Sequence, residues 1–330
     1  MPRFSRNTSN PIPRTMRNLR IVFMGTPDFA VGTLKKLVEN NYDIAGVITA
    51  PDKPAGRGRK LQESAVKKYA VAQNLKVLQP GNLKDEQFLS ALRALEANLQ
   101  VVVAFRMLPR AVWQMPEYGT FNLHASLLPD YRGAAPINRA IMNGETVTGV
   151  TTFFIDDKID TGEIIMQTKT DIGPDENAGD LHDKLMNIGA GLVLDTVRQI
   201  EAGKVVTQKQ EEPGVLKTAG KIHKDTCKTD WNDSMENIYN HIRGLSPYPG
   251  AWTTLVDGEK EEQVKIFRAE KEKGRHNEPS GKVITGKNEV KVAVRDGFIR
   301  LLEIQLPGKR KMHITDVLNG YTFGPEANVS

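Results

Sequence analysis

The sequence predicts an α/β protein in which a Rossmann-like, doubly wound and mostly parallel sheet is followed by a small C-terminal β-barrel of OB-like type. Three observations support this prediction. The 330 residues exceed what one ordinary core holds, so two domains are expected. Continuous apolar runs alternate with helical periodicity in the first part of the chain, which is typical of a parallel sheet covered by helices. Beyond Thr207, a polar stretch leads to short strand-like runs separated by turns, which favour a barrel.

Hydrophobic periodicity predicts the elements of the first domain. Residues 19–25 form an apolar run that ends in glycine, as in a buried parallel strand. Thr26 and Pro27 then predict an N-cap and a first helical residue, and 29–37 has helical spacing. The remaining strands are predicted at 42–50, 75–78, 99–105, 119–124, 147–155 and 163–170, and the remaining helices at 63–73, 85–96 and 177–203.

A polar segment that contains proline and glycine, residues 207–221, predicts a linker between two domains. We therefore expect a first domain over 19–206 and a second over 222–330. The basic extension over 1–18 is expected to be disordered. In the second domain, 234–243 has helical spacing, and the runs that follow alternate like strands.

Composition excludes several classes of protein. No apolar run reaches the ~18–20 residues of a membrane span, and the N-terminus lacks the apolar segment of a secretory signal. The single cysteine, Cys227, excludes an internal disulfide, and the scattered histidines do not suggest a metal site. We expect a cytoplasmic protein with no metal and no membrane partner. The net charge of +5 permits a polyanionic partner without requiring one.

Asn122 and His124 form the first candidate site. Alternate residues of a strand point to the same side, so this pair shares a face and Leu123 takes the other. The pair ends its strand at the carboxyl edge of the predicted sheet, where ligands bind in open α/β folds. A polar pair that only caps the following turn is the alternative interpretation.

Asp160 adds a carboxylate from a later turn, Asp-Thr-Gly, between two predicted strands. Turn chemistry alone can explain this tripeptide. In the functional interpretation, Asp160 reaches His124 and holds its working tautomer. The set would suit direct transfer of an acyl-type group to an amine, with Asn122 donating to the oxyanion and His124 handling the amine proton. No serine or cysteine nucleophile is then needed.

A basic loop over 50–62 carries Lys53, Arg57, Arg59 and Lys60. A solvated surface is one explanation of such a charge run. The loop exceeds the ~2–6 residues of a typical strand-to-helix connection and follows a strand end, so it also suits a phosphate backbone. Neither a G-x-G-x-x-G nor a P-loop motif occurs, so a dinucleotide or nucleotide triphosphate site is not expected.

Several stretches resemble the 10-formyltetrahydrofolate-dependent formyltransferase family. They are RIVFMGTPDFA (20–30), PDKPAGRGRKL (51–61), FNLHASLLPDYRGAAPINRAI (121–141), IDTGEI (159–164) and RGLSPYPGAW (243–252). The N-x-H-x-S-L-L-P motif with the later D-x-G is specific to the family. The basic loop and the P-Y-P element resemble the family members that act on methionyl-tRNA. The resemblance extends over nearly the whole chain after the N-terminal extension.

The resemblance implies that the formyl group of the co-substrate 10-formyltetrahydrofolate is transferred to the α-amino group of initiator methionyl-tRNA, for translation initiation, by a monomer. It implies catalytic roles for Asn122, His124 and Asp160. The implied folate-binding residues are Phe105, Arg106, Leu108, Ser126, Leu127, Leu128 and Pro129. The implied tRNA-binding residues are Lys53, Arg57, Arg59 and Lys60, with Arg57 the chief candidate, and the barrel would bind tRNA along its inner side.

One segment departs from the family pattern, and two alternative functions stay open. Where the family has A-Y-G-x-I-L-P, residues 104–109 read A-F-R-M-L-P, one residue shorter and without the glycine. A folate-dependent formyltransferase acting on a small amine, such as a ribonucleotide or an amino sugar nucleotide, would share the catalytic set but not need the basic loop. A non-catalytic RNA-binding protein would not need an intact Asn/His/Asp set.

Overall fold

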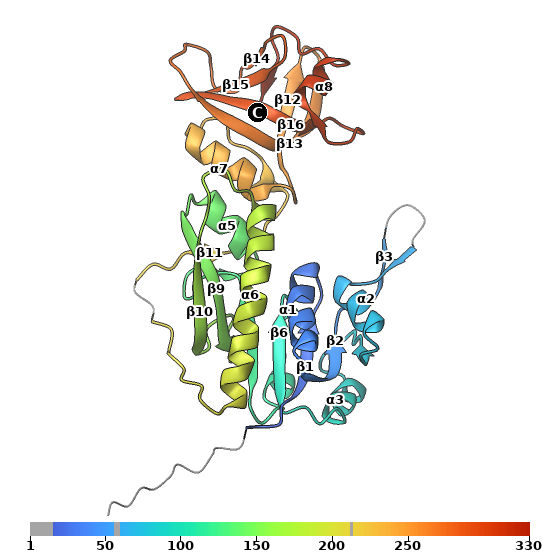
Figure 1. Cartoon of the computed structure of the whole chain (residues 1–330). Coiled ribbons are helices and arrows are strands. Elements are labelled where there is room, and N and C mark those ends of the chain that lie inside the picture. Colours follow the sequence, from blue (N-terminus) through green and yellow to red (C-terminus); the bar gives the residue numbers. More distant parts are fainter. Residues whose placement is uncertain (1–15, 56–59, 212–213) are drawn as a thin grey trace, which may run out of the picture.

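The computed structural model describes residues 16–55, 60–211 and 214–330. Figure 1 shows two parts stacked along one axis, an N-terminal sheet covered by helices and a C-terminal barrel, with helix α7 (Met235–Leu245) at their junction. The predicted fold class is confirmed. No helix within the described ranges is long and apolar enough to cross a membrane.

The N-terminal sheet has a strand order that reverses beside its first strand. Its strands are β1 (Arg20–Gly25), β2 (Asp43–Ile48), β5 (Val77–Leu78), β6 (Leu99–Val103), β7 (Thr120–His124), β9 (Val147–Phe154) and β10 (Ile164–Asp171). Their order is β10-β9-β7-β6-β1-β2-β5, parallel from β7 to β5, with β9 and β10 antiparallel. The chain builds outward from β1 to β5 and then returns to β6 on the other side of β1. This reversal creates a switch point, where ligands bind in such sheets.

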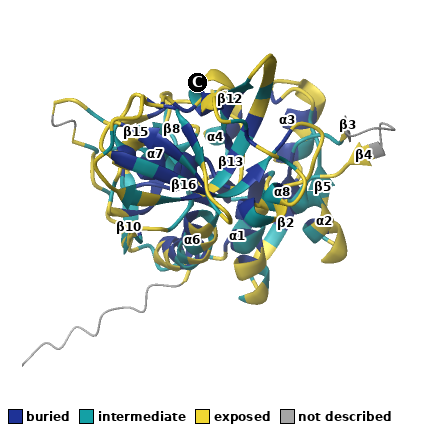
Figure 2. Cartoon of the chain, turned by 90° about the horizontal axis from the view of Figure 1, so that it is seen from above, coloured by how far each residue is buried: buried dark blue, intermediate teal, exposed yellow. Residues whose placement is uncertain are grey.

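Helices cover both faces of this sheet, as strand alternation requires. They are α1 (Asp28–Glu39), α2 (Ala65–Ala72), α3 (Glu86–Arg93), α4 (Arg110–Trp113), α5 (Pro136–Met142) and α6 (Ala178–Glu201). In β1, Phe23 packs in a core with Leu34 of α1 and Val193 of α6, whereas Met24 packs in a second core with Leu92 of α3. Figure 2 shows buried residues in dark blue in the interior of the molecule and exposed residues in yellow on outer surfaces such as that of α2.

The first helix begins one residue later than predicted. Pro27 occupies the N-cap position of α1 because its extended ψ of 175° lies outside the helical region, and Asp28 is the first helical residue. The carboxylate of Asp28 supplies the acid that the first turn of a helix favours.

The C-terminal part is an antiparallel, nearly closed barrel. Its strands are β12 (Ala251–Asp257), β13 (Lys260–Lys273), β14 (Val283–Thr285), β15 (Val290–Val294), β16 (Gly297–Gln305), β17 (Met312–His313) and β18 (Asn328–Val329), and its helices are η1 (Asp225–Cys227), α7 and α8 (Ile314–Leu318). The strand order is β14-β15-β16-β13-β12-β18. The two outer edges meet because the Val283 amide donates to Ala327 O (3.0 Å) and the Val329 amide donates to Gly281 O (2.8 Å).

Parts of the predicted linker, residues 207–221, pack against the first part of the chain. Strand β11 (Thr218–Ala219) pairs in parallel with β8 (Arg132–Gly133). Gln208 exchanges two backbone hydrogen bonds with Ile164, of 2.8 and 2.9 Å. Backbone N–H and C=O groups that lie against a folded surface form hydrogen bonds with it. Composition alone does not predict such pairing. The segment therefore contributes to the surroundings of the site described below.

Candidate active site

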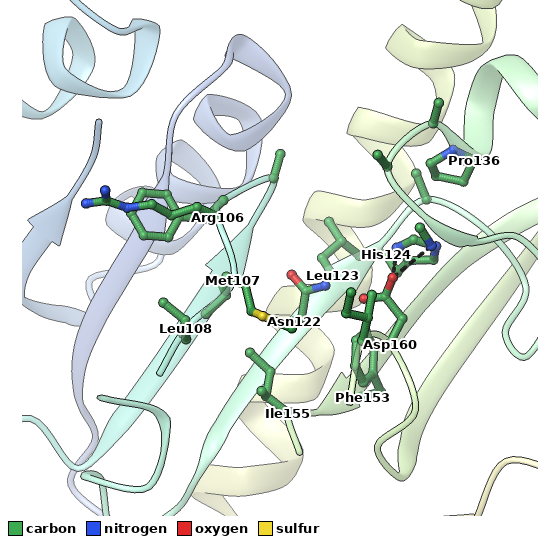
Figure 3. Close-up of a pocket in the computed structure, with 18 of the residues that line it drawn as sticks. Arg106, Met107, Leu108, Asn122, Leu123, His124, Pro136, Phe153, Ile155 and Asp160 are labelled. Atoms are coloured by element: carbon green, nitrogen blue, oxygen red, sulfur yellow. Dashed lines mark hydrogen bonds and ion pairs between the residues drawn. The ribbon is translucent and has the colours of Figure 1, made fainter. Parts of the chain in front are cut away.

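A cavity of about 780 Å³ opens at the carboxyl ends of β6 and β7, next to the switch point. Its volume lies within the ~300–1,000 Å³ of small-molecule sites. Asn122, His124 and Asp160 line it together (Figure 3). Much of the remaining wall is apolar and includes Val102, Phe105, Leu108, Trp113, Phe153 and Ile155.

Asn122 offers an unpaired carboxamide to this cavity. It lies on β7 between the 104–108 segment on one side and the His124–Asp160 pair on the other (Figure 3). Its side chain makes no hydrogen bond to any residue in the described ranges. A carboxamide has both a donor and an acceptor, so Asn122 can donate to an oxygen of a bound molecule.

His124 is buried, with 6% of its surface exposed, and its tautomer is fixed by the backbone. Nε2 lies 2.8 Å from the carbonyl oxygen of Tyr131. A carbonyl only accepts, so Nε2 must carry a proton. Nδ1 is left facing Asp160 Oδ2 at 3.9 Å, which is too long for a hydrogen bond. The sequence-based expectation that Asp160 holds the tautomer is therefore corrected, because the Tyr131 carbonyl does so.

Asp160 is held in place by two other segments. Its Oδ2 accepts a hydrogen bond from the Gly133 amide at 2.9 Å, and its backbone has a left-handed φ of 55°. The side-chain amide of Gln210 donates to the carbonyls of Asp160 (2.9 Å) and Gly162 (2.8 Å). Residue 162 must be glycine because a Cβ there would lie 1.6 Å from the carbonyl oxygen of Phe154. The carboxylate therefore has one fixed position beside the imidazole.

A polar cluster of Tyr131, Glu145 and Lys217 fixes the residue whose carbonyl oxygen accepts from His124; Tyr131 is buried, Glu145 partly buried and Lys217 exposed. The Tyr131 hydroxyl and Lys217 Nζ both donate to Glu145 Oε1 at 2.5 Å. Burial, followed by the Glu145 contact, raises the pKa of the Tyr131 phenol, so the hydroxyl stays a donor. Burial works to raise the pKa of Glu145, but the hydrogen bonds from Lys217 and Tyr131 outweigh it and lower that pKa. Lys217, from the predicted linker, thus anchors the loop that orients His124.

Arg106 has a structural role that the sequence did not suggest. Phe105, Arg106 and Leu108 all line the cavity, and their predicted contact with folate stays a prediction. The Arg106 guanidinium donates to the carbonyl oxygens of Pro80 and, at 2.9 Å, Gly81. It points away from Asn122 and lies over the Phe105 ring, 5.5 Å from its centroid (Figure 3). Partial shielding from water lowers the pKa of Arg106, although the side chain is largely exposed and an arginine remains charged at neutral pH. Arg106 therefore ties the shortened segment to the turn after β5.

The structure does not bring Ser126, Leu127, Leu128 or Pro129 into the cavity lining. Ser126 is fully buried and donates to the carbonyl of Asp130 at 2.7 Å. The Leu128 carbonyl accepts a hydrogen bond from Gln167 at 2.9 Å. Residues 126–129 lie outside the cavity lining and are held by hydrogen bonds to neighbouring segments. Their direct contact with folate stays a prediction.

The basic loop stands apart from the cavity as a hairpin of β3 (Lys53–Ala55) and β4 (Lys60–Gln62), beside α2 (Figure 1). Lys53 is exposed, whereas Arg57, Arg59 and the side chain of Lys60 lie outside the described residues. Asp52 anchors the base of the hairpin by accepting from Lys67 Nζ (2.5 Å) and Gln79 Nε2 (2.8 Å). These two hydrogen bonds lower the pKa of the Asp52 carboxyl.

The described lining of the cavity combines an amide, an imidazole and a carboxylate and contains no serine, threonine or cysteine. In the described part of the chain, no group of three or more His, Cys, Asp or Glu side chains could hold a metal ion. The formyl transferase family matches residues 19–197, and the formyl transferase C-terminal domain matches 221–322. The chain belongs to the formyl transferase family.

Within that family, the chain groups with the methionyl-tRNA formyltransferases. The methionyl-tRNA formyltransferase of Flavobacterium johnsoniae is 60% identical over 314 residues, which cover 95% of this chain and 100% of the relative. That of Bacteroides fragilis strain ATCC 25285 is 55% identical over 309 residues, which cover 92% of this chain and 95% of the relative.

Two solved structures share the fold at low identity. The structure of WlaRD, a sugar 3N-formyl transferase with dTDP and 5-N-formyl-THF, has a TM-score of 0.62 and 21% identity, and the match covers 89% of this chain and all of that one. The structure of HypX from Aquifex aeolicus with tetrahydrofolic acid has a TM-score of 0.64 and 18% identity, covering 92% of this chain and 47% of that one. These likenesses concern the fold alone.

Proposed function

We propose that this protein transfers the formyl group of 10-formyltetrahydrofolate to the α-amino group of initiator methionyl-tRNA, giving the formylated tRNA for translation initiation in the cytoplasm. The observation that carries the proposal is the convergence of a free Asn122 carboxamide, His124 Nδ1 and the Asp160 carboxylate at one apolar cavity. The relatives named methionyl-tRNA formyltransferases at 55–60% identity support this choice of acceptor.

The cavity suits the flat heteroaromatic part of a folate donor. Phe105, Leu108 and Trp113 offer apolar surface, and Asn122 faces them from β7. Pockets of this kind hold a ring by apolar contact and orient it with a few polar groups. Arg106 would act on the folate donor indirectly, by fixing residues 104–108, which form one wall of the cavity.

The three polar residues divide the work of direct transfer. The donor supplies a formyl carbon bound to nitrogen, and its oxygen gains negative charge as the amine adds. Asn122 Nδ2 can donate to that oxygen, and a single such donor is worth about 10²–10³-fold in rate. His124 can take the amine proton only at Nδ1, because Nε2–H is committed to the Tyr131 carbonyl. Asp160 then compensates the positive charge on the ring, and the proton held at Nδ1 passes to the departing nitrogen as the old C–N bond breaks, which leaves His124 neutral again.

Recognition of the tRNA is assigned to the basic hairpin and the barrel. Lys53 and Lys60 lie on the two strands of the hairpin, and Arg57 and Arg59 fall between them in the sequence. Cations on a projecting arm bind phosphates without base specificity, so this contact should weaken as salt rises.

The test is formyl transfer by the purified full chain from 10-formyltetrahydrofolate to initiator methionyl-tRNA. Free methionine and a nucleotide-linked amino sugar serve as alternative acceptors. We expect transfer to the charged tRNA and a far lower rate with the other two. Transfer to the amino sugar nucleotide in preference to tRNA, or to none of the three acceptors, would overturn the proposal.

A further inference from the structure

A second cavity, of about 1,150 Å³, lies between the two parts of the molecule and adjoins the first. Ile137, Asn138 and His182 line both cavities. The two spaces therefore meet at these three side chains, and a molecule whose reactive end lies near Asn122 can extend into the second cavity. We call this second cavity the junction groove.

The junction groove contains an aromatic side chain that packing does not explain. Tyr248, from the P-Y-P element, is 83% exposed. Its hydroxyl makes no hydrogen bond to any residue in the described ranges. Tyrosine is enriched at binding surfaces because its ring offers apolar area and its hydroxyl a polar end.

The backbone that carries Tyr248 is firmly attached on both sides. The Gly179 amide, in the first turn of α6, donates to Ser246 O at 3.1 Å. Lys265 Nζ, on β13, donates to Pro249 O at 3.0 Å, and the Gly250 amide donates to Leu245 O at 2.8 Å. Tyr248 is thus an exposed ring on a fixed turn, so little backbone entropy is lost when a ligand stacks on it.

An exposed cation lies on the β13 wall of the same groove. Arg268 stands at an irregularity in the β13–β16 pairing, where bulges redirect side chains. It makes no ion pair with any residue in the described part of the chain, whereas the neighbouring Glu270 is paired with Arg300 and Lys311 with Glu303. The α6 wall carries acids, among them Asp180 and Asp183, so a phosphate is favoured only on the β13 side.

We propose that Tyr248 and Arg268 form a nucleotide site for the single-stranded acceptor end of the tRNA. Tyr248 stacks on a base, and Arg268 contacts a phosphate next to it. This inference rests on the proposed function: if the esterified amino acid occupies the first cavity, the nucleotides joined to it must occupy the adjoining one. Stacking on an aromatic ring and contact with a phosphate are sequence-tolerant, as binding of an acceptor end common to many tRNAs requires.

The first test compares Tyr248→Ala, Tyr248→Phe and the wild type in steady-state transfer to initiator methionyl-tRNA. Loss of one stacked base should raise KM for the tRNA about tenfold in Tyr248→Ala and leave the affinity for a folate analogue unchanged. Tyr248→Phe keeps the ring and should behave as the wild type. An unchanged KM in Tyr248→Ala, or an equal loss in both variants, would overturn the stacking role.

The second test uses salt. Arg268→Gln should weaken tRNA binding and reduce the slope of log affinity against log salt by about one, as expected for one lost phosphate contact. Arg295→Gln, at an exposed turn of the barrel outside the groove lining, is the matched control and should leave the slope unchanged. An unaltered slope in Arg268→Gln contradicts the inference. If the wild type transfers no formyl group to tRNA, the proposed function itself fails, and that result is distinguishable from either outcome here.

Discussion

At the scale of single residues, the protonation and position of each catalytic side chain depend on its hydrogen-bond partner. The carbonyl of Tyr131 assigns the proton of His124 to Nε2, so Nδ1 is the working nitrogen. Asp160 lies near Nδ1 at 3.9 Å and owes its own position to the Gly133 amide. The carboxylate therefore acts on His124 through charge rather than through a hydrogen bond.

Asp160→Asn should isolate that charge. Asparagine tolerates the left-handed φ of 55° at this position, and its side-chain oxygen can still accept from the Gly133 amide, so the loop should keep its shape. We expect kcat for formyl transfer to fall by about 10²–10⁴-fold with little change in KM for the tRNA. Asp171→Asn, at an exposed position of β10 outside the cavity lining, is the control. A near-native kcat in Asp160→Asn would show that the carboxylate is not needed.

Arg106→Ala should weaken binding of the folate donor. The substitution removes two hydrogen bonds from a charged donor to the turn after β5, each worth about 1.5–3 kcal/mol where it is well shielded and less at this exposed position. The 104–108 wall should loosen, so we expect KM for the donor to rise several-fold with kcat nearly unchanged. Arg106→Lys should be intermediate because an ammonium group cannot reproduce the planar fork. Titration with a folate analogue measures the change, and an unaltered affinity in Arg106→Ala contradicts the role.

At the scale of elements, the linker between the two parts takes part in building the site. Gln210 bridges two carbonyls of the Asp160 loop and accepts from Arg132 through its Oε1. Lys217 bonds Glu145 and so fixes the Tyr131 loop on the other side of His124. Two segments, 50 and 72 residues upstream of these contacts, are therefore held by one segment that composition describes only as polar.

Gln210→Glu should remove the hydrogen bonds that Gln210 donates while keeping the one that it accepts. Glutamate can still accept from Arg132 but has no donor for the carbonyls of Asp160 and Gly162. We expect kcat to fall by about threefold to tenfold, less than in Asp160→Asn, and amide exchange of residues 156–163 to become faster. Gln208→Ala is the matched control, because Gln208 pairs with Ile164 through backbone atoms alone. Exchange rates equal to those of the wild type in Gln210→Glu would rule out the bridging role.

The contrast between these elements shows what the sequence could predict. Strand alternation placed Asn122 and His124 on one face, and helical periodicity located α6 to within two residues at each end. Neither periodicity predicts contacts that are made by backbone atoms or by segments far apart in the sequence. The contact of His124 with Tyr131 involves a backbone carbonyl, which every residue has, so the residue type does not predict it. The hydrogen bonds of Arg106 to Pro80 and Gly81 can be foreseen only once the order of the strands in the sheet is known.

At the scale of the whole molecule, α7 joins the two parts through several polar contacts. Arg243 is 8% exposed and donates to the carbonyl of Glu176 at 2.8 Å, and the Tyr239 hydroxyl donates to Asp175 at 2.7 Å. Asn138 of α5 donates to the carbonyl of Gly244 at 2.8 Å. The junction groove lies beside these contacts, so the position of the barrel relative to the active site depends on them.

His241, also on α7, should make stability depend on pH near neutrality. Burial lowers its pKa below the ordinary value of 6.5, and its Nε2 faces the Cys227 carbonyl at 3.4 Å. As pH falls below about 6.5, the unfolded chain binds a proton at this position that the folded chain does not, so the free energy of unfolding decreases. The contribution is fully present above the unfolded pKa and is lost as pH falls through the folded one.

Replacing His241 by glutamine should flatten this dependence. The difference in urea midpoint between pH 7.5 and pH 5.5 should be smaller in His241→Gln than in the wild type, because the variant has no group to protonate there. His223→Gln, at an exposed position before η1, is the matched control and should keep the wild-type difference. If His241→Gln and the wild type lost the same stability over this range, another group would be responsible, and the partly buried His241 imidazole would have no part in the pH response.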